Sequence, residues 1–291
     1  MSVSINPISF NYPSPAAIAS YQQEGAICLR QIIAEPWLDL CRRGVERSVA
    51  NPGKFFRDYT AEDSPNRYLF DYWIWQSIPE LGKFTLESDL AGVIAKLLQT
   101  DRLTLLMDQW FRREAGSTNA AVWHHDEPYF DFTDGQKCVV WFPLESASSE
   151  EGLTLIGGSH KWGKLFMPQN FGQKKPFAGD MIEYAPIEDF DEYSDRFLSW
   201  DMEPGDCLVF DFRTIHRATS HNRRCPRTLN RMSYRYGDRN VRFKPRGEWT
   251  AEISEHLLAA GQERNGVVEN PLCPLVYKQN TDNAQRTDMS A

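Results

Sequence analysis

The sequence lacks the signals of metal–thiolate, secreted and membrane proteins. Its cysteines include no C-x-x-C pair, which excludes a zinc ribbon and a thioredoxin-like redox site. Met1 to Tyr12 has no basic start followed by an apolar run, so no secretory signal is predicted. No apolar run approaches the roughly 18 residues of a membrane span. We therefore expect a cytoplasmic protein with reduced cysteines and no membrane partner.

Positive charge is also scarce. The chain has 32 Lys and Arg against 40 Asp and Glu, and its formal net charge is −8. An acidic protein repels phosphate backbones, so a nucleic-acid partner is not expected. The same charge argues, less strongly, against a polyanionic substrate such as an acyl-coenzyme A.

The order of the predicted elements indicates the fold. Turn-bounded strands follow a helical first third, which favours a jelly-roll barrel braced by helices. Helices are predicted over Ser14–Glu24, Pro36–Val49 and Leu86–Leu98. Strands are predicted over Ala26–Ile33, Leu103–Phe111, Ala120–His124, Cys138–Leu144, Leu153–Ile156, Phe197–Met202, Cys207–Phe212 and Leu229–Tyr236.

The fold class is therefore mainly β with flanking helices around a double-stranded β-helix core of the jelly-roll or cupin kind. We expect one domain over residues 1–291. It would comprise a helical support at about 14–100, the core at about 102–250 and a polar tail at about 280–291. The long irregular segment Lys161–Asp195 is expected to form an ordered lid, because it carries several aromatic residues.

The segment Trp123 to Glu127 carries the most informative residues. On a strand, His124 and Asp126 would face one side, and His125 and Glu127 the other. Either pair offers an imidazole and a carboxylate to one metal ion. A third ligand would complete a facial triad that leaves positions open, which suits iron(II) with a cosubstrate and dioxygen.

The third ligand must come from elsewhere in the chain. The other histidines are His160, His216, His221 and His256. His216 is the best candidate, because it follows a buried-looking strand that the turn Pro204-Gly205-Asp206 introduces.

A 2-oxoglutarate cosubstrate would need a cation for its distal carboxylate, and arginine provides a bidentate one. Arg231 is the preferred candidate, and Ser233 would face the same way on its strand. Arg227, four residues before Arg231, would also face this way on a strand, but it lies closer to the preceding loop.

Each of these residues has a simpler structural reading when taken alone. A histidine or arginine is more often a hydrogen-bond or ion-pair partner than a ligand, and only the combination favours a metal enzyme. Two alternatives stay open: a 2-oxoglutarate-independent metalloenzyme of the cupin type, and a non-catalytic binding protein on the same scaffold. The first would prefer three histidines and form no succinate; a metal assay would reveal the second.

From about Gly25 to Thr250 the chain resembles the phytanoyl-CoA dioxygenase family of Fe(II)/2-oxoglutarate oxygenases. The likeness rests on five segments in order, the strongest being FRREAGSTNAAVWHHDEPYF at 111–130. The others are VVWFPL at 139–144, EGL at 151–153 with GSHKWG at 158–163, LSWDMEPGD at 198–206 before His216, and SYRYGD at 233–238.

The resemblance implies the ligand set His124, Asp126 and His216, with His125 pointing outward and His160 in a structural turn. It implies the cofactors Fe(II), 2-oxoglutarate and O2, with ascorbate as reductant in vitro. The implied reaction is hydroxylation, desaturation or cyclisation of a small organic metabolite, with release of succinate and CO2. Because a related halogenase would lack the Asp126 carboxylate, halogenation is not expected.

The sequence departs from the family pattern at three places. The family's arginine usually follows the distal histidine at the distance of Arg227, whereas alignment on Ser233 puts Leu229 there; an Arg-x-Ser pair resembling other 2-oxoglutarate oxygenases favours Arg231. Ala121-Val122 replaces a common Thr-Pro. Arg113 replaces a common lysine and is a further candidate for binding the cosubstrate.

The aromatic residues Trp123, Tyr129, Phe130 and Trp141 are expected to line the substrate pocket. The identity of the substrate cannot be read from the sequence. The oligomeric state is also open, with a homodimer as one option.

Overall fold

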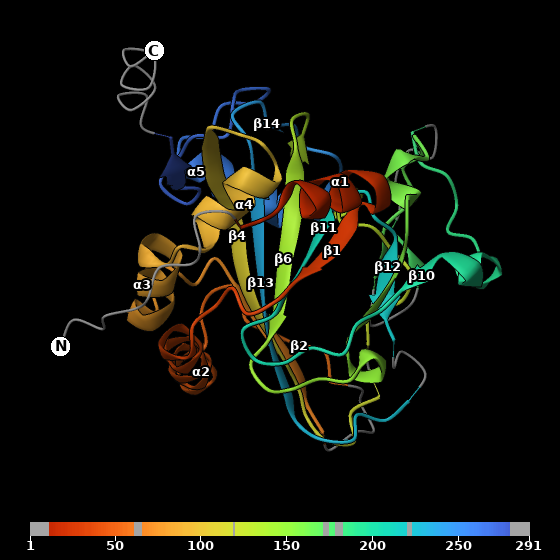
Figure 1. Cartoon of the computed structure of the whole chain (residues 1–291). Coiled ribbons are helices and arrows are strands. Elements are labelled where there is room, and N and C mark those ends of the chain that lie inside the picture. The colour runs from red at the N-terminus through yellow and green to blue at the C-terminus, as the bar shows by residue number, and fades with distance from the viewer. Residues whose placement is uncertain are drawn as a thin grey trace, which may run out of the picture.

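The computed structural model describes residues 12–60, 66–118, 120–170, 175–177, 183–219 and 223–279 (Figure 1). None of the helices in this part of the chain has the length and hydropathy needed to cross a bilayer.

An antiparallel sheet of eight strands forms the centre of the fold. The strand order is β1-β11-β6-β13-β4-β3-β2, and β15 also pairs with β4. The bounds are β1 Ala26–Leu29, β2 Arg57–Asp58, β3 Tyr68–Tyr72, β4 Arg102–Arg113, β6 Lys137–Pro143, β11 Cys207–Asp211, β13 Leu229–Gly237 and β15 Leu275–Lys278. In its interior, β13 pairs with both β4 and β6, which fixes the register of the long central strands.

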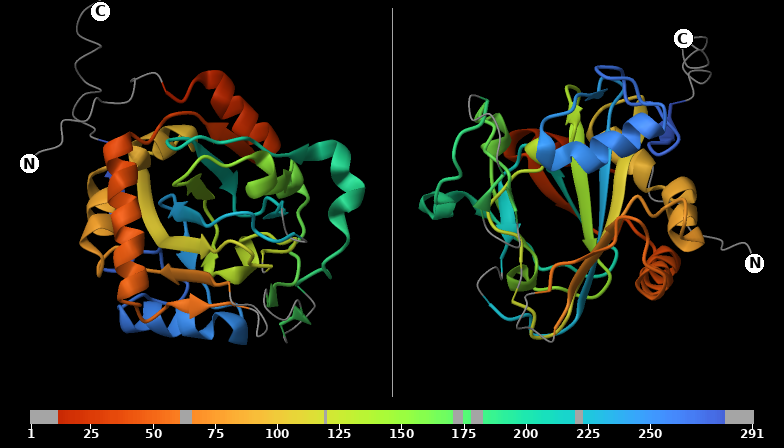
Figure 2. Two further views of the ribbon diagram at one scale, coloured as in Figure 1. Left: turned by 90° about the horizontal axis from the view of Figure 1, so that it is seen from below. Right: turned by 180° about the vertical axis from the view of Figure 1, so that it is seen from behind.

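A smaller antiparallel sheet lies opposite one face of the large sheet (Figures 1 and 2). It contains β10 Phe197–Leu198, β7 Leu153–Ile156 and β12 His216–Ala218. Two strand pairs complete the structure, β5 Phe132–Thr133 with β14 Arg242–Phe243, and β8 Gln169–Asn170 with β9 Lys175–Pro176. Buried residues of both sheets, including Val139, Phe210 and Leu155, share one apolar cluster. The expected jelly-roll class, mainly β with flanking helices, is confirmed.

Helices α2 Glu35–Ala50, α3 Pro79–Glu87 and α4 Leu90–Leu97 cover the other face of the large sheet (Figure 2). Helix α1 Pro15–Glu24 precedes β1, and α5 Ala251–Ala259 packs through Leu257 into the apolar cluster between the two sheets. The short 3-10 helices are η1 Glu127–Tyr129, η2 Ser149–Glu151, η3 Ser159–Lys161, η4 Phe190–Arg196 and η5 Glu248–Thr250. Leu38 of α2, Phe84 of α3 and Ile94 of α4 are buried in one cluster with Val140 and Tyr234 of the sheet. The large sheet therefore packs apolar residues on both of its faces.

Local sequence signals explain the best-predicted boundaries. Ser14 caps α1 by accepting a hydrogen bond from the Ala17 N–H at 3.2 Å. Gly25 ends that helix with φ 72°, a left-handed conformation that glycine adopts without steric cost.

Three predicted strands and one predicted helix need correction. The strand expected over Ala26–Ile33 is β1, which ends at Leu29. Ala120–His124 is not a strand: it forms only the isolated bridge between His124 and His216, because the chain bends at Asp126 into η1. Strand Phe197–Met202 shortens to β10, with Met202 in a separate bridge to Ala147. The single helix expected over Leu86–Leu98 is two, since α3 stops at Glu87 and α4 begins at Leu90.

Candidate metal centre

His124, Asp126 and His216 meet between the two sheets, although the two histidines lie 92 positions apart in the sequence. The backbones of His124 and His216 form a bridge, with N–H to carbonyl distances of 3.0 and 2.8 Å. This bridge places the two imidazoles with ring centroids 4.1 Å apart. One ligand atom from each of the three side chains lies within 4.8 Å of the others, and all three residues are buried. Among the described residues, this is the only group of three that meets this criterion.

Both imidazoles present an unprotonated nitrogen to the centre. Nδ1 of His124 contacts the Val122 carbonyl at 2.7 Å, and Nδ1 of His216 contacts the Thr214 carbonyl at 2.9 Å. A carbonyl only accepts, so each Nδ1 carries the proton and each Nε2 keeps its lone pair. Burial lowers the pKa of His124 to about 3, further lowered by nearby His216, and burial also lowers the pKa of His216. Neutral imidazoles with an unprotonated Nε2 are the form that binds a metal ion.

The Asp126 carboxylate divides its two oxygens between the histidines and an arginine. Oδ1 lies 3.7 Å from Nε2 of His124 and 3.7 Å from Nε2 of His216. Oδ2 accepts a hydrogen bond from Nε of Arg235 at 2.8 Å. Burial is the largest single influence and raises the pKa of Asp126, but the charge and hydrogen bond of Arg235, together with nearby His216 and His124, outweigh it, and the pKa is lowered. The carboxylate is therefore held ionised with one oxygen free to act as a ligand.

Arg235 is a site residue that the sequence prediction missed. Its Nη1 donates to Oε1 of Gln109 at 2.9 Å, and its guanidinium lies 4.5 Å from the Phe130 ring centroid. These contacts fix Arg235 in a buried position beside Asp126. A signal was present in the sequence, because Arg231, Ser233 and Arg235 alternate along one strand and so share a face.

His125 and Glu127 lie outside the centre, but the expectation that His125 points outward is wrong. His125 is 1% exposed, and its Nε2 accepts a hydrogen bond from the Phe166 N–H at 3.0 Å. Glu127 is buried beside Lys137 and Arg246, at 3.3 and 2.7 Å. The two side chains thus hold the segment around Asp126 against the rest of the fold.

Replacing His125 with alanine is expected to destabilise the fold without emptying the metal centre. The variant leaves the buried Phe166 N–H without its acceptor, which costs about 1–3 kcal/mol in free energy of unfolding. Urea denaturation checks the stability, and manganese titration checks the stoichiometry, expected to stay at one ion per chain. A variant that no longer binds manganese would place His125 among the ligands.

A cavity of about 340 Å³ opens beside the three candidate ligands. Tyr129, Phe130 and Trp141 line it, as the sequence led us to expect. Trp123 does not line the cavity: its ring lies under the Arg217 guanidinium at 4.3 Å and packs against Phe190. Although Trp123 directly precedes the candidate ligand His124, its side chain points toward η4 and not into the cavity.

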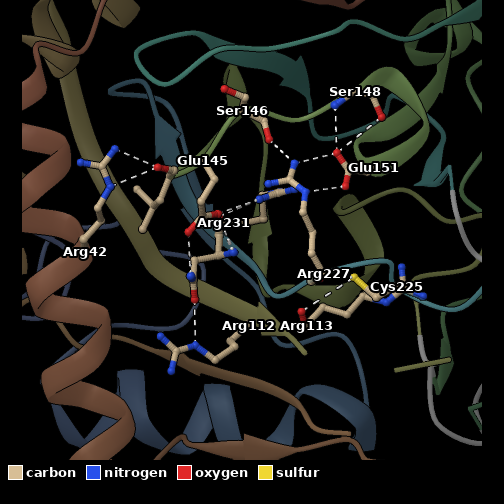
Figure 3. Close-up of polar contacts among 12 residues, drawn as sticks. Arg42, Arg112, Arg113, Glu145, Ser146, Ser148, Glu151, Cys225, Arg227 and Arg231 are labelled. Carbon is tan, nitrogen blue, oxygen red and sulfur yellow. Dashed lines mark hydrogen bonds and ion pairs between the residues drawn. The ribbon is translucent and has the colours of Figure 1, made fainter. Parts of the chain in front are cut away.

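The three candidate arginines lie in different surroundings (Figure 3). Arg231 lines the cavity and is 5% exposed. Its guanidinium lies 5.4 Å from the Trp141 ring centroid and 3.4 Å from Glu145, and its buried Nη2 has no hydrogen-bond partner among the described residues. Burial lowers the pKa of Arg231 to about 10. It is therefore a buried cation only partly neutralised by its neighbour.

Arg227 lies outside the lining of the cavity. It forms a bidentate pair with Glu151, with Nε and Nη2 at 2.9 and 2.8 Å from the carboxylate oxygens (Figure 3). Arg113 does line the cavity, but its Nη2 donates to the carbonyls of Ser117 and Arg223 at 3.1 and 2.7 Å. Ser233 also lines the cavity; it lies two residues after Arg231 on β13 and therefore on the same face of the strand. The geometry therefore separates Arg231 and Ser233 from Arg227.

The remaining histidines stay away from the cluster. Nε2 of His160 lies 3.3 Å from the Gln22 carbonyl, on the short helix η3. His256 of α5 packs edge-on against Phe55, with centroids 4.6 Å apart. His221 lies outside the described residues.

Comparisons with known proteins point in one direction. Residues 21–228 match the family model described as phytanoyl-CoA dioxygenase. A search of curated proteins finds no match.

Solved structures also match this chain. One is the non-heme alpha-ketoglutarate-dependent carbocyclase SnoK from nogalamycin biosynthesis, with 17% identity, TM-score 0.70, 94% of this chain and 100% of the other covered. Another is the epimerase SnoN with Fe3+, alpha-ketoglutarate and nogalamycin RO, with 16% identity, TM-score 0.69 and coverages of 90% and 97%. A third is EctD from S. alaskensis with 2-oxoglutarate and 5-hydroxyectoine, with 18% identity, TM-score 0.62 and coverages of 84% and 83%. At these identities the likeness establishes the fold.

Proposed function

The chain belongs to the phytanoyl-CoA dioxygenase family, and on that premise we propose that His124, Asp126 and His216 hold the iron of an Fe(II)/2-oxoglutarate-dependent oxygenase. The class of enzyme follows from the family. The assignment of the ligands rests on one observation, the convergence of two Nε2 atoms and one carboxylate oxygen within 4.8 Å.

The donor set fits ferrous iron. Two neutral imidazoles and one carboxylate form the facial triad of non-heme Fe(II) oxygenases, which leaves positions for a cosubstrate and for dioxygen. A cupin-type enzyme without 2-oxoglutarate would favour a third histidine, where this chain has Asp126. The Nδ1 hydrogen bonds to Val122 and Thr214 orient the rings before the metal binds.

Arg231 and Ser233 are the proposed holders of the distal carboxylate of 2-oxoglutarate. Arg231 stands four residues from Arg235 on β13, roughly 13 Å along the strand, so a molecule spanning from Asp126 toward Arg231 would lie along this row. The unpartnered Nη2 of Arg231 offers a charge-assisted hydrogen bond, and the Ser233 hydroxyl a second bond.

Charge balance supports the same arrangement. Asp126 pairs with Arg235 and Arg231 lies beside Glu145, so these four side chains carry no net charge and a bound ferrous ion would add two uncompensated positive charges. The two carboxylates of 2-oxoglutarate would supply the two negative charges that balance them, with the far carboxylate beside the buried Arg231 guanidinium.

When bound, iron and 2-oxoglutarate supply the oxidising chemistry with O2, and release succinate and CO2. The chain's own residues have three tasks in this reaction. The two histidines and Asp126 fix the metal, Arg231 and Ser233 orient the cosubstrate, and the aromatic lining around Tyr129 and Phe130 keeps water from the centre.

The substrate is proposed to be a small organic metabolite, and the outcome hydroxylation, desaturation or cyclisation. Support comes from structural neighbours that are a carbocyclase and an epimerase of nogalamycin biosynthesis. A cytoplasmic, reducing location is supported by the six cysteines, all of which are free. A homodimer stays a prediction, which analytical ultracentrifugation would test.

The experiment that tests the proposed function measures succinate from 2-oxoglutarate with Fe(II), ascorbate and O2, against a panel of metabolites. Succinate should form only with iron and oxygen present, and at least one panel member should raise its rate. Oxidation of a substrate with no consumption of 2-oxoglutarate would favour the cupin-type alternative. No iron binding would favour a non-catalytic protein.

A further inference from the structure

The cavity extends beyond the region assigned to iron and 2-oxoglutarate, along the large sheet toward β3. Phe70 pairs with Phe111 in register, and Phe111 pairs with Arg231. Two strand spacings, roughly 10 Å, therefore separate the row of Arg231 from Phe70. Phe70, Phe111 and Tyr72 line this part of the cavity and form what we call its sheet wall.

A second wall comes from the C-terminal region and from the segment Lys161–Asp195. Trp249 of η5, Ile253 of α5 and Phe177 line the same cavity, and we call them the helical wall. Nε1 of Trp249 donates to the Pro128 carbonyl at 2.8 Å, which ties this wall to the segment after Asp126. The Phe177 and Trp249 rings lie 6.4 Å apart with an interplanar angle of 21°. The helical wall is thus held in place by contacts within the protein.

The charged side chains that line this part of the cavity already have partners in the described structure. Arg57 forms an ion pair with Glu252. Glu151 pairs with Arg227 at 2.8 Å, and Arg113 donates to backbone carbonyls. A substrate phosphate or carboxylate would have to break one of these contacts, whereas an apolar carbon skeleton would bury itself against aromatic rings at no such cost.

We propose that the space between the sheet wall and the helical wall binds a compact, uncharged substrate with an apolar carbon skeleton, and that the chain does not accept an acyl-coenzyme A. The inference rests on the proposed function, because it takes Arg231 as the partner of 2-oxoglutarate. The whole cavity, including the region assigned to iron and 2-oxoglutarate, measures about 340 Å³, at the lower end of the range for small-molecule sites, so the part left for the substrate admits only a small molecule.

Three probes test the proposed class on the full chain loaded with Mn(II) and 2-oxoglutarate. They are 2-naphthol, uncharged at neutral pH; 2-naphthalenesulfonate, with the same rings and a negative charge; and octanoyl-coenzyme A. By calorimetry, 2-naphthol should bind, the sulfonate should bind at least about tenfold more weakly, and octanoyl-coenzyme A should not displace 2-naphthol. Equal binding of the sulfonate, or displacement by octanoyl-coenzyme A, would overturn the proposal.

Variants of the two walls localise the binding. Trp249→Ala should weaken 2-naphthol binding about tenfold, because it removes the largest ring of the helical wall. Phe70→Leu should weaken it severalfold and guards against misfolding of the first variant. Trp37→Ala is the matched control, because Trp37 packs against Phe84 on the other side of the sheet. Unchanged naphthol affinity in both wall variants would refute the location.

The same samples separate this inference from the proposed function. Mn(II) binding, followed by electron paramagnetic resonance, and 2-oxoglutarate affinity should stay within about twofold in Trp249→Ala and Phe70→Leu. Failure of the unaltered chain to bind Mn(II) and 2-oxoglutarate would refute the proposed function. 2-Naphthol is therefore also titrated into the metal-free chain. Weaker binding in the two wall variants there would still support a binding site between the sheet wall and the helical wall.

Discussion

Replacing Asp126 with alanine is expected to abolish metal-dependent turnover and to weaken Mn(II) binding by at least about 100-fold. Losing a residue that only hydrogen-bonds to a metal ligand already lowers metal affinity roughly 10–100-fold, and losing a ligand should cost more. The change removes the only carboxylate of the candidate centre. It also leaves the buried Arg235 cation without its counter-ion, which should cost about 3–5 kcal/mol in free energy of unfolding. Calorimetric titration with Mn(II) and urea denaturation measure the two effects.

A second substitution separates the metal-binding role of Asp126 from its structural role. The double variant Asp126→Ala with Arg235→Met removes the unpaired cation and should regain most of the lost stability, but it should still bind no metal. Asp39→Ala, at an exposed position of α2, is the control and should match the unaltered chain. Normal metal affinity in a stable double variant would remove Asp126 from the ligand set.

Replacing Arg231 with alanine is expected to raise the Michaelis constant for 2-oxoglutarate by roughly 30-fold or more. A buried charge-assisted pair is worth about 2–5 kcal/mol, and 2 kcal/mol already corresponds to a change of that size. Metal affinity should change little, because Arg231 contacts none of the three candidate ligands. Initial rates of succinate release at varied 2-oxoglutarate concentration provide the measurement.

Arg227→Ala is the matched control for this experiment. Arg227 is 45% exposed at its side chain and pairs with Glu151 outside the cavity lining, so its loss should change the Michaelis constant less than about threefold. If Arg227→Ala produced the larger rise, the spacing expected from the family would be right. The register of β13 would then have to differ from that in the structure.

The sequence predicted the long strands of the large sheet because their apolar runs and turns are local signals. β4, β6, β11 and β13 all lie within two residues of their predicted bounds. The isolated pairing of His124 with His216 joins residues that lie 92 positions apart, and no local sequence pattern encodes such a contact. Residues 124–126 therefore do not form the strand whose alternation placed His124 and Asp126 on one face, although the two side chains do lie together.

The surroundings of the site were harder to predict than its members. The resemblance to the family implied that His125 points outward, away from His124 and Asp126. The chain bends at Asp126 into η1, and His125 is instead buried against Phe166. Likewise, the Arg-x-Ser pair favoured Arg231 over Arg227, but no local pattern shows that Arg227 pairs with Glu151 while Arg231 lines the cavity. Parity along β13 could have identified Arg235, but its partner Gln109 is known only from the register of β13 on β4.

The most direct test of the account is the anomalous scattering of crystals of the full chain grown with Mn(II) and 2-oxoglutarate. One strong peak should lie between Nε2 of His124, Nε2 of His216 and Oδ1 of Asp126. Density for the cosubstrate should extend from that peak toward Arg231. A peak at other residues, or none where these three side chains converge, would contradict the assignment of the metal centre.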